Sequence, residues 1–103
     1  MIFDGDKMED EIKDFRKEIK EYEDRLLKMG FNLNETKTKK DWLYLEYKME
    51  NEKYYINVSI YKDKKNNKVW ANIVPLKPEE YLYYKISLDE MLSILENYFK
   101  QNF

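Results

Sequence analysis

Apolar residues in the first third of the chain recur at helical spacing. From residue 8 to residue 29 an apolar side chain occurs every three or four positions, and every residue between them is charged except Leu27. This spacing places the apolar side chains on one face, so it predicts an amphipathic helix over residues 7–29. The stripe consists of Met8, Ile12, Phe15, Ile19, Tyr22, Leu26 and Met29.

Both ends of this helix carry recognisable signals. Asp6 with Glu9 three residues later fits an N-terminal capping box. Gly30 fits a left-handed helix end, and Phe31 can fold back onto the last turn. The strict seven-residue repeat of the stripe also leaves an alternative open, in which two copies of the chain pair through the start of this helix.

The middle of the chain alternates between apolar and polar residues. Residues 42–49, 54–61 and 68–74 each show this period of two, which predicts strands with one buried face. The links at 50–52 and 63–67 are short and rich in turn-forming residues. The pattern therefore predicts an antiparallel meander of consecutive hairpins.

The segments on either side of the meander are less regular. Residues 32–41 are almost entirely polar and are interpreted as a connector. Pro75 and Pro78 are predicted to end the third strand because proline cannot donate a hydrogen bond to a sheet. Residues 81–86 are predicted to form a short fourth strand or an extended edge segment.

The last helix is predicted to begin at Ser87, with Glu90 completing a second capping box, and to run to about residue 100. Together these elements predict one α+β domain over residues 1–103. Its order is α-β-β-β-(β)-α, with an antiparallel sheet of three or four strands packed against the N- and C-terminal helices. The predicted core consists of Ile12, Phe15, Ile19, Tyr22, Leu26, Leu43, Leu45, Ile56, Val58, Ile60, Val69, Ile73, Leu92, Leu95 and Phe99.

The alternation also predicts what lies on the other face of the sheet. If the helices cover one face, five aromatic residues point away from them among polar neighbours, namely Trp42, Tyr44, Tyr55, Tyr61 and Trp70. Tryptophan and tyrosine are enriched at protein interfaces because they offer a large contact area with a polar group. This face is therefore a candidate docking surface. The alternatives are that residues 76–86 or a crossing helix cover it, or that nucleic-acid bases stack on it.

Composition excludes several kinds of chemistry. The chain has no histidine and no cysteine, and its only glycines are Gly5 and Gly30. Thiol catalysis, the usual nucleophile–base arrangements, cysteine–histidine metal sites and glycine-rich phosphate loops are therefore absent. We expect a protein that is not an enzyme and that has no cofactor or metal site.

Charge is unevenly distributed although the net charge is only −2. Residues 1–30 carry −3, residues 31–75 carry +3 and residues 76–103 carry −2. The acidic residues of the first helix that are candidates for contact with a basic partner are Glu9, Asp10, Asp14 and Glu18. The lysine-rich loop 62–68 could instead meet phosphates.

No apolar run approaches the roughly 20 residues that span a bilayer, and residues 1–6 do not resemble a signal peptide. We therefore expect a cytoplasmic protein without a membrane partner. Its richness in Lys, Asn, Ile and Tyr suggests an A/T-rich bacterium, or one of its phages or plasmids.

The predicted element order resembles that of double-stranded-RNA-binding domains. In that family the second helix opens with lysines that grip phosphates, whereas the matching residues here, 87–91, are acidic. The resemblance therefore implies the topology without the residues that carry the family's function. In size, charge and lack of an active site the chain is also similar to anti-CRISPR inhibitors and toxin-immunity proteins of mobile elements.

These observations lead to a non-enzymatic, protein-binding protein as the first functional hypothesis. Its most concrete form is a small acidic inhibitor from a phage or mobile element that blocks a host nuclease or defence effector. Electrostatic attraction would speed its association with a basic groove. The alternatives are a nucleic-acid-binding module, and a structural homodimer, assembly factor or immunity protein.

Overall fold

The computed structural model describes residues 4–77 and 82–101 of the chain, with side chains over 10–75 and 82–100. Along the chain the elements are α1 (Asp4–Glu18), α2 (Lys20–Met29), β1 (Asn32–Thr38), β2 (Trp42–Glu50), β3 (Tyr55–Asp63), β4 (Lys68–Lys77), β5 (Tyr83–Ile86) and α3 (Leu88–Gln101).

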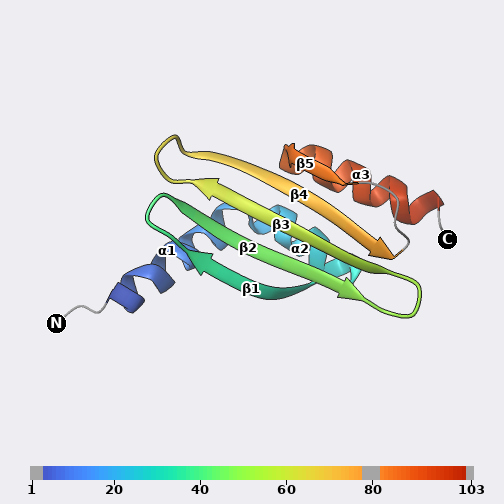
Figure 1. The fold of residues 1–103 in the computed structure, drawn as a ribbon, viewed down its shortest axis with the longest axis horizontal. Helices are drawn as coiled ribbons and strands as arrows, with labels where there is room; N and C mark the ends of the chain where they lie inside the picture. The colour runs from blue at the N-terminus through green and yellow to red at the C-terminus, as the bar shows by residue number, and fades with distance from the viewer. Residues whose placement is uncertain (1–3, 78–81, 102–103) are drawn as a thin grey trace.

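The five strands form one open antiparallel sheet in the order β1-β2-β3-β4-β5. Each strand therefore pairs with its neighbour in the sequence, as the hairpin-like links predict. Figure 1 shows the helices on one side of this sheet, with α1 and α2 behind β2 and β3 and with α3 along β4 and β5. The predicted α+β class and element order are confirmed.

The strand that the polar pattern did not reveal is β1, which occupies most of the predicted connector. It pairs antiparallel with β2, from Asn32 opposite Lys48 to Thr38 opposite Leu43. As an edge strand, β1 is held by backbone pairing and buries few side chains. The interpretation of residues 32–41 as a connector was therefore wrong, and the sheet has five strands where three or four were expected.

The predicted first helix is two helices, because the chain bends at Ile19. The backbone of Ile19 has φ −103° and ψ 19°, which lies outside helical geometry, while its side chain is only 2% exposed. The apolar spacing continues through the bend, which is why the pattern predicted one continuous helix. The start is also earlier than predicted, since α1 begins at Asp4 and Asp6 lies within it.

The other helix ends follow the sequence signals. Gly30 adopts φ +109°, and the amide of Phe31 donates to the carbonyl of Leu26 at 3.0 Å, which together form a left-handed helix end. Ser87 caps α3, because its Oγ accepts a hydrogen bond from the Glu90 amide at 3.0 Å. The left-handed end at Gly30 and the cap by Ser87 are confirmed.

The predicted end of the third strand was wrong, because β4 continues through Pro75 to Lys77. A register shift between Tyr55 and Ile56 on the neighbouring strand accompanies this extension. Irregular positions of this kind are where a sheet accommodates proline. Residues 78–81, including Pro78, lie outside the described part of the chain, and the predicted fourth strand is β5, beginning at Tyr83.

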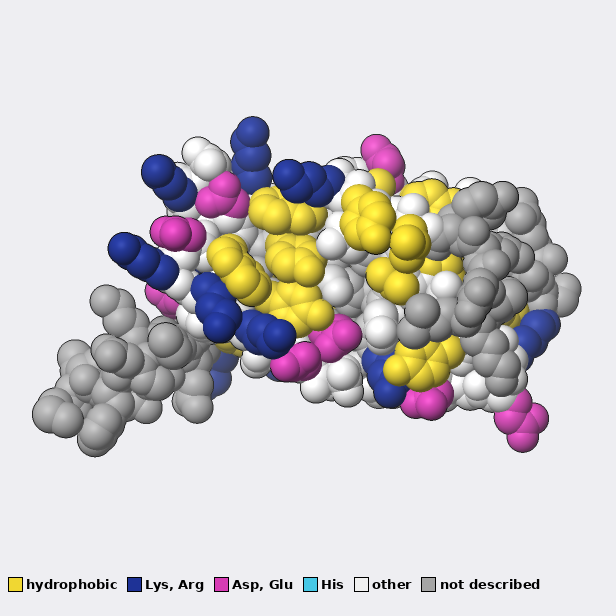
Figure 2. All heavy atoms as spheres, in the orientation of Figure 1, with side chains coloured by type: hydrophobic (Ala, Val, Ile, Leu, Met, Phe, Trp, Pro, Cys, Tyr) yellow, Lys and Arg dark blue, Asp and Glu magenta, His cyan; other side chains and the backbone are white. Residues whose placement is uncertain are grey.

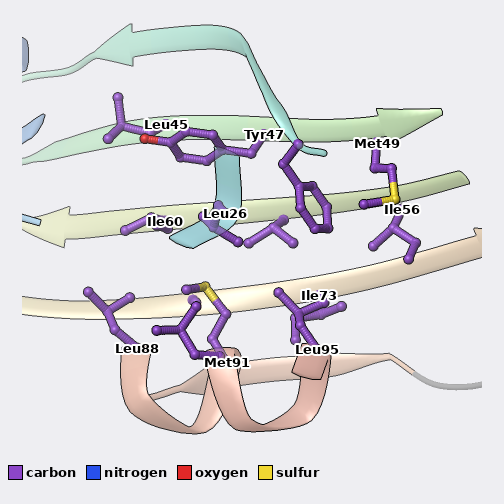
Figure 3. Close-up of a cluster of buried hydrophobic side chains, with 14 of the residues drawn as sticks. Leu26, Leu45, Tyr47, Met49, Ile56, Ile60, Ile73, Leu88, Met91 and Leu95 are labelled. Carbon is purple, nitrogen blue, oxygen red and sulfur yellow. The ribbon is translucent and has the colours of Figure 1, made fainter. Parts of the chain in front are cut away.

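The core lies between the helices and the inward face of the sheet. Figure 3 shows Leu88, Met91 and Leu95 of α3 directed toward the strands. Of the predicted core residues, Ile12, Tyr22 and Val69 are only partly buried, and the other twelve are buried. The structure adds Phe31, Tyr47, Met49, Tyr54, Ala71, Leu88 and Met91.

A charged network is built into this core where α1, α2 and β2 meet. Glu23 is 7% exposed, and its carboxylate accepts two hydrogen bonds from the Arg16 guanidinium, at 2.9 and 3.1 Å. It also accepts a hydrogen bond from the hydroxyl of Tyr47, which is fully buried. The network therefore fixes the bent helix pair against β2.

Candidate functional site

The face of the sheet opposite the helices is the candidate site. Along β2, β3 and β4 buried side chains alternate with half-buried ones over residues 42–48, 55–61 and 70–74. The half-buried set contains the five aromatic residues that the sequence analysis singled out, namely Trp42, Tyr44, Tyr55, Tyr61 and Trp70. Among the described elements, the helices all lie on the other side of the sheet (Figure 1).

Four of these aromatic residues form one cluster, which we call the aromatic surface: Trp42, Tyr44, Tyr61 and Trp70. Tyr44 and Tyr61 have ring centroids 5.0 Å apart, and Tyr61 stacks on Trp70 at 5.6 Å with only 10° between the ring planes. Trp42 lies 6.3 Å from Tyr44 and 6.1 Å from Tyr61. Figure 2 shows this patch beside the β1–β2 and β3–β4 turns.

Lysine side chains flank the aromatic surface on both sides. Tyr44, Tyr61 and Trp70 lie directly opposite one another on β2, β3 and β4. Lys37 lies opposite Tyr44 on β1, and its Nζ is 5.5 Å from the Tyr44 ring centroid. The Nζ of Lys85 on β5 is 5.7 Å from the Trp70 ring centroid. A row of three rings with an ammonium group at each end thus crosses the five strands, over about 19 Å of backbone spacing.

Lys85 is held in an uncommon backbone conformation. Its φ is +51°, a value that residues other than glycine rarely adopt. Its amide donates a hydrogen bond to the Oδ1 of Asn72 at 2.8 Å, and Asn72 lies on the same face as the aromatic surface. This bond fixes the backbone from which the Lys85 side chain reaches Trp70.

Further lysines occupy the two turns beside the aromatic surface. Lys39 and Lys40 in the β1–β2 turn and Lys65 and Lys68 at the β3–β4 turn are exposed. None of the four has an ion pair within the described part of the chain, and Lys37 has only a 3.8 Å contact with Glu35. This end of the sheet therefore presents positive charge to solvent, which Figure 2 shows as dark blue side chains at the margin of the patch.

The Asp63 carboxylate stabilises the β3–β4 turn by hydrogen bonds within that turn. Asp63 accepts hydrogen bonds from the Asn66 side chain at 2.8 Å and from the amides of Lys65 and Asn66 at 3.0 and 3.3 Å. The Asn66 side-chain hydrogen bond is the main cause that lowers the pKa of Asp63 below its ordinary value. Asp63 therefore stays ionised and fixes the turn that carries Lys65 and Lys68.

Tyr55 does not belong to the cluster, although it lies on the same face. It pairs with Glu50 at the opposite end of the sheet, and its ring is contacted by the Nζ of Lys48 at 4.9 Å. Six residues along β3 separate it from Tyr61, which corresponds to roughly 20 Å. The structure therefore confirms that Tyr55 lies on the predicted face but places it outside the cluster of rings, and its role in binding stays a prediction.

The acidic residues predicted to bind a partner lie on the helix side of the sheet. Asp10, Asp14 and Glu18 are exposed on α1, and Glu9 lies in α1 with its side chain outside the described part. Glu18 forms an ion pair with Lys62 at 2.6 Å, which ties the helix to β3. The structure therefore separates the predicted acidic and aromatic residues onto opposite sides of the molecule.

The exposed surface of α1 and α2 has mixed charge. Lys13, Lys17 and Lys20 are exposed among the carboxylates, and Lys20 pairs with Asp24 at 2.9 Å. The apolar side chains of α1 pack within their own chain, because Phe15 is part of the core and Ile12 packs against that core. The self-pairing alternative predicted that these two side chains face a second copy, whereas the structure places them against the sheet of their own chain.

Burial is the main cause that raises the pKa of Tyr44 above its ordinary value, so its hydroxyl stays neutral near pH 7. Over the described side chains, no group of three or more Asp or Glu is placed to hold a metal ion. In the same part of the chain, every helix is too short or too polar to cross a membrane.

Lys37 and Lys85 are the residues of this site that the sequence analysis missed. Lys37 lay in the segment interpreted as a connector, so nothing placed it beside Tyr44. Its partnership with Tyr44 depends on the register between β1 and β2, which contains an irregularity near Leu33. Lys85 depends similarly on the irregular pairing of β5 with β4.

In comparisons with known proteins, no family model, curated protein or solved structure matches this chain.

Proposed function

We propose that the protein is a non-enzymatic binding protein that acts by docking its aromatic surface onto a macromolecular partner. One observation carries the proposal: a row of three rings, flanked by Lys37 and Lys85, lies on a sheet face that the described helices leave uncovered. Tryptophan and tyrosine in such a position supply the large, rigid contact area that dominates binding energy at interfaces.

The non-enzymatic role is proposed because the chain lacks the side chains that most enzymes use. There is no histidine or cysteine to serve as base or nucleophile. The largest change in pKa among the described side chains belongs to Tyr47, whose hydroxyl lies in the core with Glu23. The Tyr47–Glu23 network lies on the helix side of the sheet, away from the aromatic surface. It holds α1 and α2 against β2.

The narrower inhibitor hypothesis stays a prediction. In that version the acidic first helix imitates nucleic-acid charge, which requires a continuous negative surface. The exposed lysines among the carboxylates of α1 and α2 interrupt such a surface.

A second copy of the chain is disfavoured as the partner, because two aromatic surfaces placed face to face would bring their flanking lysines together. The proposal therefore rests on the aromatic surface.

A pull-down from native host lysate tests this proposal. The double variant Tyr61→Thr/Trp70→Thr removes two rings and replaces them with threonine, a β-branched residue that strands favour. Loss of two central interface aromatics corresponds to at least about 2 kcal/mol of binding energy, so we expect recovery of the partner to fall about 30-fold or more. Circular dichroism would show whether the variant is folded. If it is not, the single variant Tyr44→Thr takes its place in the pull-down.

The matched control is Leu27→Gln. Leu27 is an exposed apolar residue of α2, with 44% of its surface accessible, on the helix side of the sheet. The control should recover the same partner as the unmodified protein. Equal recovery by the unmodified protein and by a folded variant of the aromatic surface would overturn the proposal.

A further inference from the structure

We infer that the partner of the aromatic surface is a single-stranded nucleic acid, an inference that rests on the proposed function above. The combination of flat aromatic faces with flanking ammonium groups fits a chain that carries both stackable bases and phosphates. The row Lys37–Tyr44–Tyr61–Trp70–Lys85 offers both kinds of contact in one line across the strands.

The cations at this surface are lysines, as are all but two of the basic residues of the chain, and lysine suits phosphate contacts. Lysine is depleted in protein–protein interfaces, where arginine is the enriched cation. Both arginines of the chain, Arg16 and Arg25, bind carboxylates on the helix side, in contact with Glu23 and Glu96. All the cations at the aromatic surface are lysines.

The lysines near this end of the sheet divide into two groups. Lys62 and Lys64 form ion pairs with Glu18 and Glu11 of α1, at 2.6 and 2.9 Å, so their charge is neutralised on the helix side. The second group is exposed in the turns without an ion pair in the described part: Lys39, Lys40, Lys65 and Lys68. These four lysines lie beside the rings, where a phosphate backbone would run, and they outnumber the carboxylates of Glu35 and Glu46 near Tyr44.

The shape of the site favours a single strand over a duplex. The rings lie on an open sheet face, and stacking on them requires bases that are not already paired inside a helix. The start of α3, where double-stranded-RNA-binding domains have lysines, carries exposed Asp89 and Glu90. These carboxylates would repel a duplex at that position.

The acidic net charge does not oppose this inference, because charge is divided between the two sides of the sheet. The acidic helices α1 and α2 lie on one side, whereas the lysines of the β1–β2 and β3–β4 turns border the aromatic surface on the other. An anionic chain would therefore be attracted more strongly to the aromatic side than to the helices, whose exposed surface has mixed charge. Because stacking tolerates every base, we expect little sequence preference.

Tryptophan fluorescence provides the test, because both tryptophans of the chain, Trp42 and Trp70, belong to the aromatic surface. The full chain would be titrated with an oligothymidylate of about 12 nucleotides, a length within the range that one binding domain covers. We expect saturable quenching. Log affinity should fall linearly with log salt, with a slope of about −1.4 to −3 for two to four phosphate contacts. The complementary duplex should bind at least about tenfold more weakly.

The double variant Lys37→Gln/Lys85→Gly removes both flanking charges, and glycine tolerates the positive φ at residue 85. We expect affinity to fall about tenfold and the salt slope to become shallower by about 1.4. The matched control Lys13→Gln/Lys17→Gln removes two exposed lysines of α1 and should leave both quantities unchanged.

Three outcomes would overturn the inference: no quenching at low ionic strength, equal binding of poly-glutamate, or equal loss of affinity in the α1 control. If the oligonucleotide fails while the aromatic surface still captures a nuclease-resistant protein, the proposed function stands and the nucleic-acid partner is wrong. If both fail, the proposed function is wrong as well.

Discussion

Replacing Phe31 with alanine is expected to lower the free energy of unfolding by about 3–5 kcal/mol. The ring is 1% exposed and meets the ring of Phe99 edge-on, with centroids 6.3 Å apart. Its backbone amide also closes the end of α2 on the carbonyl of Leu26. Removing the ring leaves a cavity where α2, α3 and the sheet meet, and the rigid helix end limits how far the surroundings can collapse into it.

Urea denaturation would measure this loss. Leu27→Ala is the matched control, because Leu27 lies four residues earlier and is 44% exposed. The control should change the free energy of unfolding by less than about 1 kcal/mol. A Phe31→Ala variant as stable as this control would show that the helix end does not dock on the core as described.

Replacing Glu23 with alanine is expected to lower the free energy of unfolding by about 2–3 kcal/mol. The change leaves the fully buried Tyr47 hydroxyl without its hydrogen-bond partner and Arg16 without its carboxylate. Arg16 is 42% exposed in its side chain, so water can replace part of what it loses, and the expected value lies below that for breaking a fully buried ion pair. A double-mutant cycle with Tyr47→Phe would isolate the hydroxyl–carboxylate contribution, and strict additivity would contradict the network.

The same network predicts a pH dependence. Burial, and next the hydrogen bond to Glu23, raise the pKa of Tyr47 well above its ordinary value of 10.0. The folded state therefore keeps a proton that the unfolded state releases above about pH 10. The free energy of unfolding should fall as pH rises beyond that value, by up to about 1.4 kcal/mol per pH unit for this group. Tyr47→Phe should show a shallower fall, and an unchanged slope would contradict this assignment.

The sequence was sufficient to predict the strands in which buried and half-buried side chains alternate strictly. The period of two in β2, β3 and β4 correctly predicted which residues face the helices, because one face of each strand is buried. It failed for β1, where Leu33 is the only apolar residue and the backbone pairs at an edge. It also failed at Ile19, where the helix bends without interrupting the apolar stripe.

The candidate site was predictable in part for a related reason. Alternation determines the face on which Trp42, Tyr44, Tyr61 and Trp70 lie, but it does not determine their neighbours across the strands. Those neighbours depend on strand register, which brought Lys37 and Lys85 to the rings, whereas the distance of Tyr55 from Tyr61 follows from their spacing along β3. Register is decided by tertiary pairing and by irregularities such as the one near Leu33, which no local pattern encodes.

Binding of a single-stranded nucleic acid to the aromatic surface is tested most directly by photo-crosslinking. The full chain would be crosslinked to an oligonucleotide that carries 5-iodouracil, and the crosslinked peptides would be mapped. This base couples efficiently to the aromatic side chains on which it stacks. We expect crosslinks at Trp42, Tyr44, Tyr61 or Trp70, and about tenfold fewer of them in the Lys37→Gln/Lys85→Gly variant at protein concentrations below the dissociation constant. Crosslinks on α1, α2 or α3, or no crosslink at low salt, would contradict this expectation.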